Sequence, residues 1–166
     1  HDTESDRIAH EALSAARSVG SVAAEIRALG CIGRNATLVG DVDSGVRTLR
    51  DALTLARSGG DPIGAAEISI ELALALHWAG DLDEACRVAD EGIAECARWG
   101  AEGLGSALRA IRGVSAFLVG RWSEADDWTA AALERDPMGS HGVLAHGARA
   151  LLDLGRGNAD AAADHL

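Results

Sequence analysis

The sequence has no lysine and no tyrosine, only one phenylalanine and one methionine, and all fifteen of its cationic side chains are arginine. The missing lysine has chemical consequences, because a P-loop, a Schiff-base enzyme and a catalytic lysine all need that residue. We therefore expect no NTPase or lyase chemistry within these 166 residues.

Long apolar runs are missing as well. No stretch approaches the roughly 18 apolar residues of a membrane span, and residues 1–6 are polar and acidic rather than signal-like. The formal charge of −11 opposes a nucleic-acid or anionic-membrane surface. Three scattered cysteines suggest buried thiols rather than a disulfide or a metal clamp. We expect a soluble, cytoplasmic chain.

Four glycines follow apolar runs and open similar phrases. The phrases are Gly40-Asp41-Val42-Asp43, Gly80-Asp81-Leu82-Asp83, Gly120-Arg121-Trp122-Ser123 and Gly157-Asn158-Ala159-Asp160. Their spacings are 40, 40 and 37 residues. A fixed period of this length indicates one supersecondary unit that is copied and stacked. Function is then expected on a surface shared by the repeats rather than in a catalytic pocket.

Small residues recur at fixed distances from these glycines. Seven residues before them stand Gly33, Ala73, Gly113 and Ala150; five after them stand Gly45, Ala85, Ala125 and Ala162; and twelve after the first three stand Ala52, Gly92 and Ala132. Bulky residues follow the same period at Leu13, Leu53, Ile93 and Leu133. The pattern predicts helices that approach closely at the small residues, with the bulky ones filling the space between layers.

Cap and turn residues set the predicted helix limits. Asp61-Pro62 and Asp136-Pro137 place a capping side chain and a first-turn proline at helix starts, while Gly20, Gly60 and Gly100 end helices. The sequence predicts an all-α domain over 1–166. Its expected elements are a leading helix over 4–18 and helix pairs over 21–58 (21–39 with 43–58), 62–98 (62–79 with 83–98), 101–134 (101–119 with 123–134) and 138–166 (138–154 with 158–166).

Both ends of the sequence fall inside the period, and neither has the polar character of a capping repeat. We therefore expect a fragment of a longer array. Its two exposed apolar ends favour end-to-end association into a dimer.

The phrases Gly80-Asp81-Leu82-Asp83-Glu84-Ala85 and Gly120-Arg121-Trp122-Ser123-Glu124-Ala125 resemble the turn and second-helix start of tetratricopeptide repeats. Ala73, Ala85 and Gly92 match the three small positions of that motif. The resemblance implies a right-handed superhelical solenoid of antiparallel helix pairs with a period of about 40 residues. Arg109 and Arg112 depart from it, because they occupy first-helix phases that are usually apolar.

The extended repeat, and the closing stretch 149–166, resemble the helical region of large bacterial LuxR-family, ATP-dependent transcription regulators of the MalT type. The resemblance implies a non-catalytic, signal-transducing region without a cofactor. Its partners would be a protein, a peptide or a small-molecule inducer, together with adjacent NTPase and DNA-binding modules, and this chain would not contact nucleic acid itself. The alternative is a general protein-interaction scaffold with no transcriptional role. An enzyme is a third possibility, for which the sequence offers no catalytic residues.

In tetratricopeptide-like arrays the first helix of each pair lines the concave face, where ligands bind. The corresponding phases here are Arg27, Gly30, Arg34 and Thr37; Glu67, Ile70, Leu74 and His77; Ala107, Ala110, Val114 and Phe117; and Leu144, Gly147, Leu151 and Leu154. The predicted groove is cationic at its first end and apolar beyond. Its main candidates for ligand or partner binding are Arg27, Arg34, Thr37, Glu67, Ile70, Leu74, His77, Val114 and Phe117.

Arg27 and Arg34 are seven residues apart and so share a helix face. One interpretation is a clamp for a carboxylate or phosphate group of a ligand. The other is a pair of solvated arginines that bridge to acidic neighbours such as Glu25 or Glu67. These interpretations differ in whether the arginines are free.

His77 and Trp78 lie just before a turn, where the two rings could stack on a ligand. The alternative places Trp78 in the packing between layers and leaves His77 satisfied or solvent-facing. His141 and His146 are five residues apart and miss the spacing that joins two ligands on one helix face, so we expect no metal site.

Overall fold

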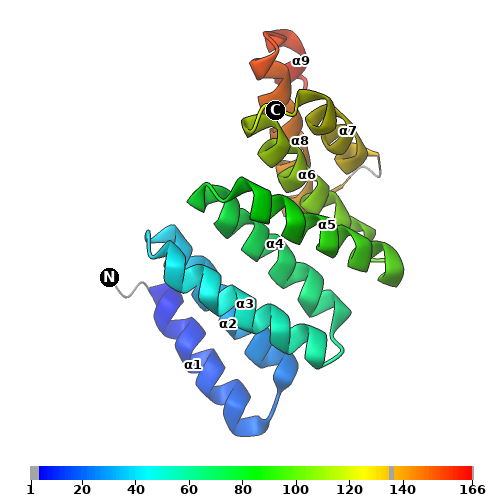
Figure 1. Ribbon diagram of the computed structural model, residues 1–166. Coiled ribbons are helices and arrows are strands. Elements are labelled where there is room, and N and C mark those ends of the chain that lie inside the picture. The colour runs from blue at the N-terminus through cyan, green and yellow to red at the C-terminus, as the bar shows by residue number, and fades with distance from the viewer. Residues whose placement is uncertain (1–3, 135–136, 166) are drawn as a thin grey trace.

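The computed structural model describes residues 4–134 and 137–165, and this part of the chain forms nine helices and no strand (Figure 1). The helices are α1 (Glu4–Val19), α2 (Val22–Leu38), α3 (Val42–Ser58), α4 (Pro62–Ala79), α5 (Leu82–Trp99), α6 (Glu102–Leu118), α7 (Trp122–Leu133), α8 (Gly139–Gly155) and α9 (Ala159–Ala163). The all-α prediction is confirmed. None of the helices in these two ranges has both the length and the apolar character needed to cross a membrane.

Glycines in the left-handed region stand between the helices. They recur every 20 residues over most of the chain, at Gly20, Gly40, Gly60, Gly80, Gly100 and Gly120. Gly80, which follows α4, has a φ of 80°, and Gly100, which follows α5, has a φ of 71°. A residue with a Cβ atom is strained there, so glycine is the residue that lets each helix stop and the chain reverse.

Aspartates that follow three of these glycines cap the next helix. The Asp61 side chain accepts a hydrogen bond from the Gly64 amide at 2.8 Å, and Pro62 occupies the first turn of α4. Asp41 and Asp81 accept similar bonds at the starts of α3 and α5. These bonds satisfy amides that have no partner within the helix, and the cap predicted at Asp61 is confirmed.

The prediction for the last helix pair is less accurate. The cap expected at Asp136 lies outside the described residues, and so does Leu166, where the last helix was expected to end. Helix α8 begins at Gly139, after Met138, so Pro137 does not lie in its first turn as predicted. Helix α9 spans only Ala159–Ala163, which is shorter than the predicted helix over 158–166.

The helices form two unequal rows. Each helix from α1 to α9 packs against the next, and α2, α4, α6 and α8 also contact one another in sequence (Figure 1). In the described residues, the backbones of α3, α5 and α7 do not approach one another in this way. The row of even-numbered helices is therefore the more closely packed side, and it forms one continuous surface.

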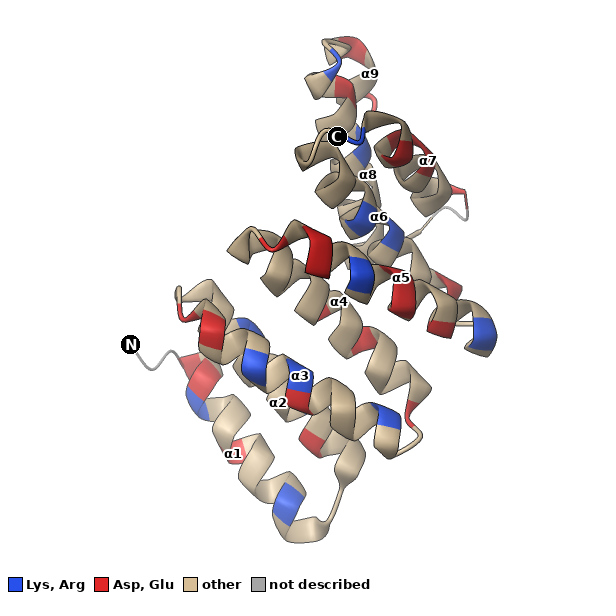
Figure 2. Ribbon diagram, viewed as in Figure 1, with Lys and Arg blue, Asp and Glu red and all other residues tan. Residues whose placement is uncertain are grey.

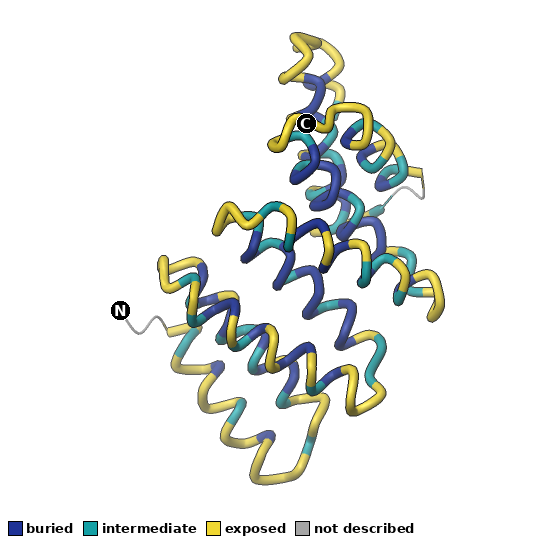
Figure 3. The backbone as a smooth tube through the Cα atoms, in the orientation of Figure 1, coloured by how far each residue is buried: buried dark blue, intermediate teal, exposed yellow. Residues whose placement is uncertain are grey.

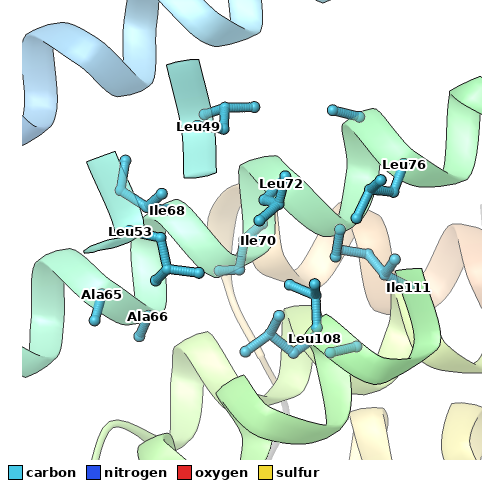
Figure 4. Packing of buried hydrophobic residues seen from close by; sticks show 14 of the residues in the cluster. Leu49, Leu53, Ala65, Ala66, Ile68, Ile70, Leu72, Leu76, Leu108 and Ile111 are labelled. Atoms are coloured by element: carbon cyan, nitrogen blue, oxygen red, sulfur yellow. The ribbon is translucent and has the colours of Figure 1, made fainter. Parts of the chain in front are cut away.

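The main core is centred on α4, which is apolar on nearly every face and contacts α2, α3, α5 and α6. Figure 4 shows Leu72 and Leu76 of α4 beside Leu108 and Ile111 of α6, with Leu49 of α3 in the same cluster. Figure 3 shows the buried residues running along the inner turns of the helices. A helix this apolar is stable only when protein covers most of its surface, which places α4 at the centre.

The small residues of the repeat lie where neighbouring helices approach. A Cβ atom on Gly33 of α2 would lie 2.6 Å from Cγ of Leu49, and one on Gly113 of α6 would lie 2.7 Å from Cγ2 of Thr129. Ala73 and Ala85 occupy equivalent positions and are fully buried. The close approach that the sequence pattern predicted at these positions is confirmed, since a larger side chain would push the helices apart.

Arg112 occupies an apolar phase of the repeat and is only 8% exposed. Its Nε atom donates a hydrogen bond to Asp90 of α5 at 3.0 Å, and Nη2 donates one to Glu124 of α7 at 3.1 Å. The guanidinium also lies 5.6 Å from the ring centroid of Trp128. Arg112 therefore joins three helices, which explains how an arginine is tolerated where the repeat usually has an apolar residue.

Candidate functional site

A groove runs along the row of even-numbered helices. It consists of two adjoining pockets of about 560 and 260 Å³, which share Leu74, Trp78 and Leu144. We call the whole surface the central groove. The larger part, the charged pocket, is lined by Arg27, Gly30, Cys31, Arg34, Glu67, Ile68, Ile70, Glu71, Leu74, Trp78, Leu104, Ser140, His141 and Leu144. The smaller part, the apolar pocket, is lined by Leu74, His77, Trp78, Ala110, Ile111, Val114, Val143, Leu144, Gly147, Ala148 and Leu151.

Both arginines of the charged pocket face carboxylates of α4. Arg34 Nη1 donates a hydrogen bond to Glu71 Oε1 at 3.1 Å, and Arg27 Nε lies 4.0 Å from Glu67 Oε2. Burial raises the pKa of Glu71, and the positive charge of Arg34 opposes that rise. Formal charge is therefore balanced in this pocket, which supports the interpretation of bridging arginines over that of a free anion clamp.

Two large hydrophobic side chains are exposed in the apolar pocket. Trp78 at the end of α4 is 55% exposed, and Val143 of α8 is 74% exposed. Ala110 and Ala148 are buried at the base of the pocket, and a Cβ atom on Gly147 would meet no atom within 4 Å. The pocket therefore has room for an apolar group that neighbouring side chains do not fill.

His77 is the polar group of the apolar pocket. Its Nδ1 atom lies 2.9 Å from Oγ of Ser115, which is fully buried on α6. Burial lowers the pKa of His77, because desolvation disfavours the charged imidazolium. The ring is therefore neutral near pH 7, and the prediction of a satisfied histidine agrees with its hydrogen bond.

The structure brings most of the predicted site residues together. Seven of the nine main candidates line the central groove, namely Arg27, Arg34, Glu67, Ile70, Leu74, His77 and Val114. Gly30, Ala110, Leu144, Gly147 and Leu151 from the wider set also line it, whereas Ala107 and Leu154 do not.

Thr37 and Phe117 were placed wrongly. Thr37 is only 6% exposed, and its hydroxyl donates a hydrogen bond to the Gly33 carbonyl at 3.0 Å on the side of α2 that faces Gly45. Phe117 lies against Trp122, with ring centroids 5.1 Å apart, and would crowd a side chain on Gly155. Both side chains pack against neighbouring helices instead, Thr37 against α3 and Phe117 against the start of α7 and the end of α8.

Several groove residues were not predicted as such, and three of them matter for recognition. Trp78, for which packing between layers was the alternative to ligand contact, is one of the three residues that line both pockets. Glu71 lies four residues after Glu67 and opposite Arg34, and that spacing was a usable signal for a second ion pair. Nothing in the sequence marked Val143, because its exposure depends on how α8 sits beside α4 and α6.

A second polar cluster lies away from the groove, near the end of the chain. Nδ1 of His146 lies 3.1 Å from Nδ1 of His165, and the buried Asp153 accepts hydrogen bonds from Arg149. Arg149 also donates to Asp126 of α7. Within residues 4–134 and 137–165 no group of three or more His, Cys, Asp or Glu side chains is arranged to hold a metal ion. We interpret this cluster as a structural link between α7, α8 and the residues that follow α9.

Comparison with known proteins adds information about the fold alone. No model of a known protein family matches the chain. No curated protein matches it by sequence. Among solved structures it is similar to BtubC (BKLC) from P. vanneervenii, with a TM-score of 0.79 and 17% sequence identity over 97% of this chain and 69% of that one. An identity this low shows a shared helical architecture and leaves function to be argued from the groove.

Proposed function

We propose that this chain is a non-catalytic binding module that holds a protein segment or a small-molecule inducer in the central groove. The supporting observation is continuity: four helices distant in sequence, α2, α4, α6 and α8, contribute side chains to one surface. A right-handed, tetratricopeptide-like solenoid accounts for the 40-residue period and for the closer packing of the even-numbered row. Stacked repeats of this kind leave an extended surface for recognition.

The more specific proposal is that the chain is the signal-transducing region of a LuxR-type transcription regulator. It rests on the resemblance of the repeat phrases and of the stretch 149–166 to such proteins. A ligand that contacts α2 and α8 together would favour one relative arrangement of these distant helices over others. Adjacent domains attached to either end could respond to that difference, which is the requirement for coupling between sites.

The alternative is a general scaffold for protein–protein interaction. The observation that favours it is the pairing of Arg27 with Glu67 and of Arg34 with Glu71. An anionic metabolite would find both of these arginines already beside a carboxylate. The two functions differ in the neighbouring coding sequence: a P-loop on one side and a helix-turn-helix on the other support the regulator. The groove serves recognition in either case.

The test uses two matched glycine substitutions. Gly147 lines the apolar pocket and Gly103 lies outside the groove, and a Cβ atom at either position meets nothing within 4 Å. Gly147→Trp should fill the pocket while Gly103→Trp leaves it open. Thermal unfolding is then followed with panels of metabolites, nucleotides and peptides, since a ligand of the folded state raises the Tm.

We expect at least one ligand class to raise the Tm of the wild type and of Gly103→Trp, but not that of Gly147→Trp. A Tm shift that survives in Gly147→Trp would place binding elsewhere on the molecule. If no ligand of any class raises the Tm, the proposal of a binding groove is wrong.

A further inference from the structure

The shape and charge of the central groove identify the class of its occupant more closely. We infer that it receives a protein segment that inserts one bulky apolar side chain into the apolar pocket and places a basic side chain beside Glu67. This inference rests on the proposed function and names the partner that the groove would take.

The apolar pocket by itself is of a size that suits a single large side chain. Its volume is about 260 Å³, and sites that enclose drug-sized ligands have volumes of about 300–1,000 Å³. The pocket continues at Leu74 and Trp78 into the charged pocket, so an occupant can extend along the groove. An anchored peptide uses such a surface, with one buried residue and contacts on either side.

The lining of the apolar pocket selects against charge in the anchor. Apart from His77, every residue described as lining it is apolar or glycine. His77 is itself neutral near pH 7, and its Nδ1 atom is occupied by Ser115. A charged group placed here would lose water without gaining an ionic partner, which is unfavourable. Large aliphatic and aromatic side chains match the exposed faces of Trp78 and Val143.

Charge at the other end of the groove favours a basic neighbour to the anchor. Glu71 is held by Arg34 at 3.1 Å, but the Glu67 side chain is 44% exposed and lies 4.0 Å from Arg27. Glu67 therefore has accessible carboxylate surface for a second cation. Arg27 is itself 69% exposed, but an acidic ligand bound to it would lie beside the Glu67 carboxylate, and Arg34 is held by the partly buried Glu71.

The charge of the whole chain acts in the same direction. Acidic residues outnumber basic ones by eleven, and Figure 2 shows them on helices from both ends of the chain. Most of the described arginines contact carboxylates. Asp43 and Asp51 of α3 and Asp127 of α7 have no ion-pair partner among the described residues and add to the surplus. Such a field attracts a basic segment and repels an acidic one before contact.

A selection experiment tests this composition directly. A library of random peptides of roughly 12–15 residues, long enough to form an isolated helix, is selected on immobilised wild-type chain. Parallel selections use Gly147→Trp, Gly103→Trp and Glu67→Gln. A fourth variant, Val143→Asn, changes a side chain that is 74% exposed and should leave folding intact if Gly147→Trp does not fold.

We expect the wild type and Gly103→Trp to enrich peptides with a large apolar residue near Lys or Arg. The affinity of these peptides for Gly147→Trp should be about tenfold lower than for the wild type, as expected when a buried anchor is lost. Their affinity for Val143→Asn should fall to a smaller extent. Glu67→Gln should retain the apolar preference and lose the basic one. Added salt should weaken binding to the wild type more than binding to Glu67→Gln.

Two outcomes would overturn the inference while leaving the proposed function intact. One is groove-dependent enrichment of acidic peptides or of peptides that bind through a free carboxylate. The other is a Tm shift that depends on the groove with a metabolite, accompanied by no enriched peptide. If no peptide and no compound distinguishes the wild type from Gly147→Trp, both the inference and the proposed function fail.

Discussion

Arg34 on α2 donates a hydrogen bond at 3.1 Å to Glu71 on α4, across the charged end of the central groove. The two residues belong to adjacent repeats, 37 positions apart. Their pairing fixes the spacing of α2 and α4 and also removes the free cation that an anionic ligand would need. One contact therefore contributes both to the packing of the repeats and to the choice of ligand.

Removing Arg34 should be more harmful than neutralising Glu71. Arg34→Met leaves a partly buried carboxylate without its partner, which should lower the free energy of unfolding by about 1 kcal/mol at pH 7. Glu71→Gln keeps an acceptor for Arg34 and removes the buried charge, so its effect should be smaller. Urea denaturation of both variants measures the difference, and equal losses would contradict it.

The pH dependence of the same pair has a defined sign. Because the pKa of Glu71 is raised in the folded state, the folded chain holds this proton more tightly than the unfolded chain. Stability from this group is therefore highest in acid and falls as the pH rises through the ordinary value of 4.5 to the folded pKa. The difference in stability between the wild type and Glu71→Gln should show this fall and should be constant at higher pH.

His77 should have the opposite pH dependence. Its pKa is lowered in the folded state, so the unfolded chain takes up its proton first. The stability it contributes is complete above the ordinary value of 6.5 and is lost as the pH falls from that value through the lower folded pKa. His77→Asn offers a non-titrating polar group near Ser115. Equilibrium unfolding between pH 8 and roughly 5.5 should show a steeper loss for the wild type, and parallel curves would contradict this account.

Two substitutions of Arg112 show whether this buried arginine stabilises the fold through its charge or through the volume of its side chain. Arg112→Ala removes two ion pairs, the contact with Trp128 and most of the buried side chain, and should cost about 2–3 kcal/mol. Arg112→Met keeps volume and leaves Asp90 and Glu124, both half-exposed, able to find water. It should cost less than half as much. Chemical denaturation measures both, and an equal loss would show that the charge is essential.

Two glycines should respond in opposite directions to alanine. Gly80 has a φ of 80°, so Gly80→Ala should destabilise the chain by about 1 kcal/mol. Gly147 lies inside α8 with open space around it, so Gly147→Ala should stabilise the chain by about 0.5–1 kcal/mol through helix propensity. Thermal unfolding of the two variants measures the contrast. A destabilised Gly147→Ala would contradict the finding that a Cβ atom fits beside Gly147 without a clash.

The helical fold and the course of the chain could be predicted because the relevant signals are local. A glycine such as Gly80 and an aspartate such as Asp61 act within one turn of their own position. Gly33 and Gly113 mark close approaches because a missing Cβ has the same effect in every repeat. The same kind of signal failed at Pro137, because α8 begins two residues later, at Gly139.

The candidate site was predicted in outline, and its details depend on neighbouring repeats. Arg27, Leu74 and Val114 line the groove because they share the phase of the inner helix face. Thr37 packs against α3 instead, where the missing Cβ of Gly45 leaves room for its side chain. The exposure of Trp78 is set by the arrangement of α4, α6 and α8, which no window of sequence contains.

The most direct test of the central groove is the rate at which Cys31 is alkylated. Cys31 is half-buried in the charged pocket, whereas Cys86 and Cys96 are buried in the core, so modification of the folded chain reports the groove. Saturation with a peptide selected on the wild type should slow alkylation of Cys31 several-fold and should have no such effect on Gly147→Trp at the same peptide concentration. An unchanged rate in the wild type, with the peptide demonstrably bound, would place recognition on another surface and contradict the account.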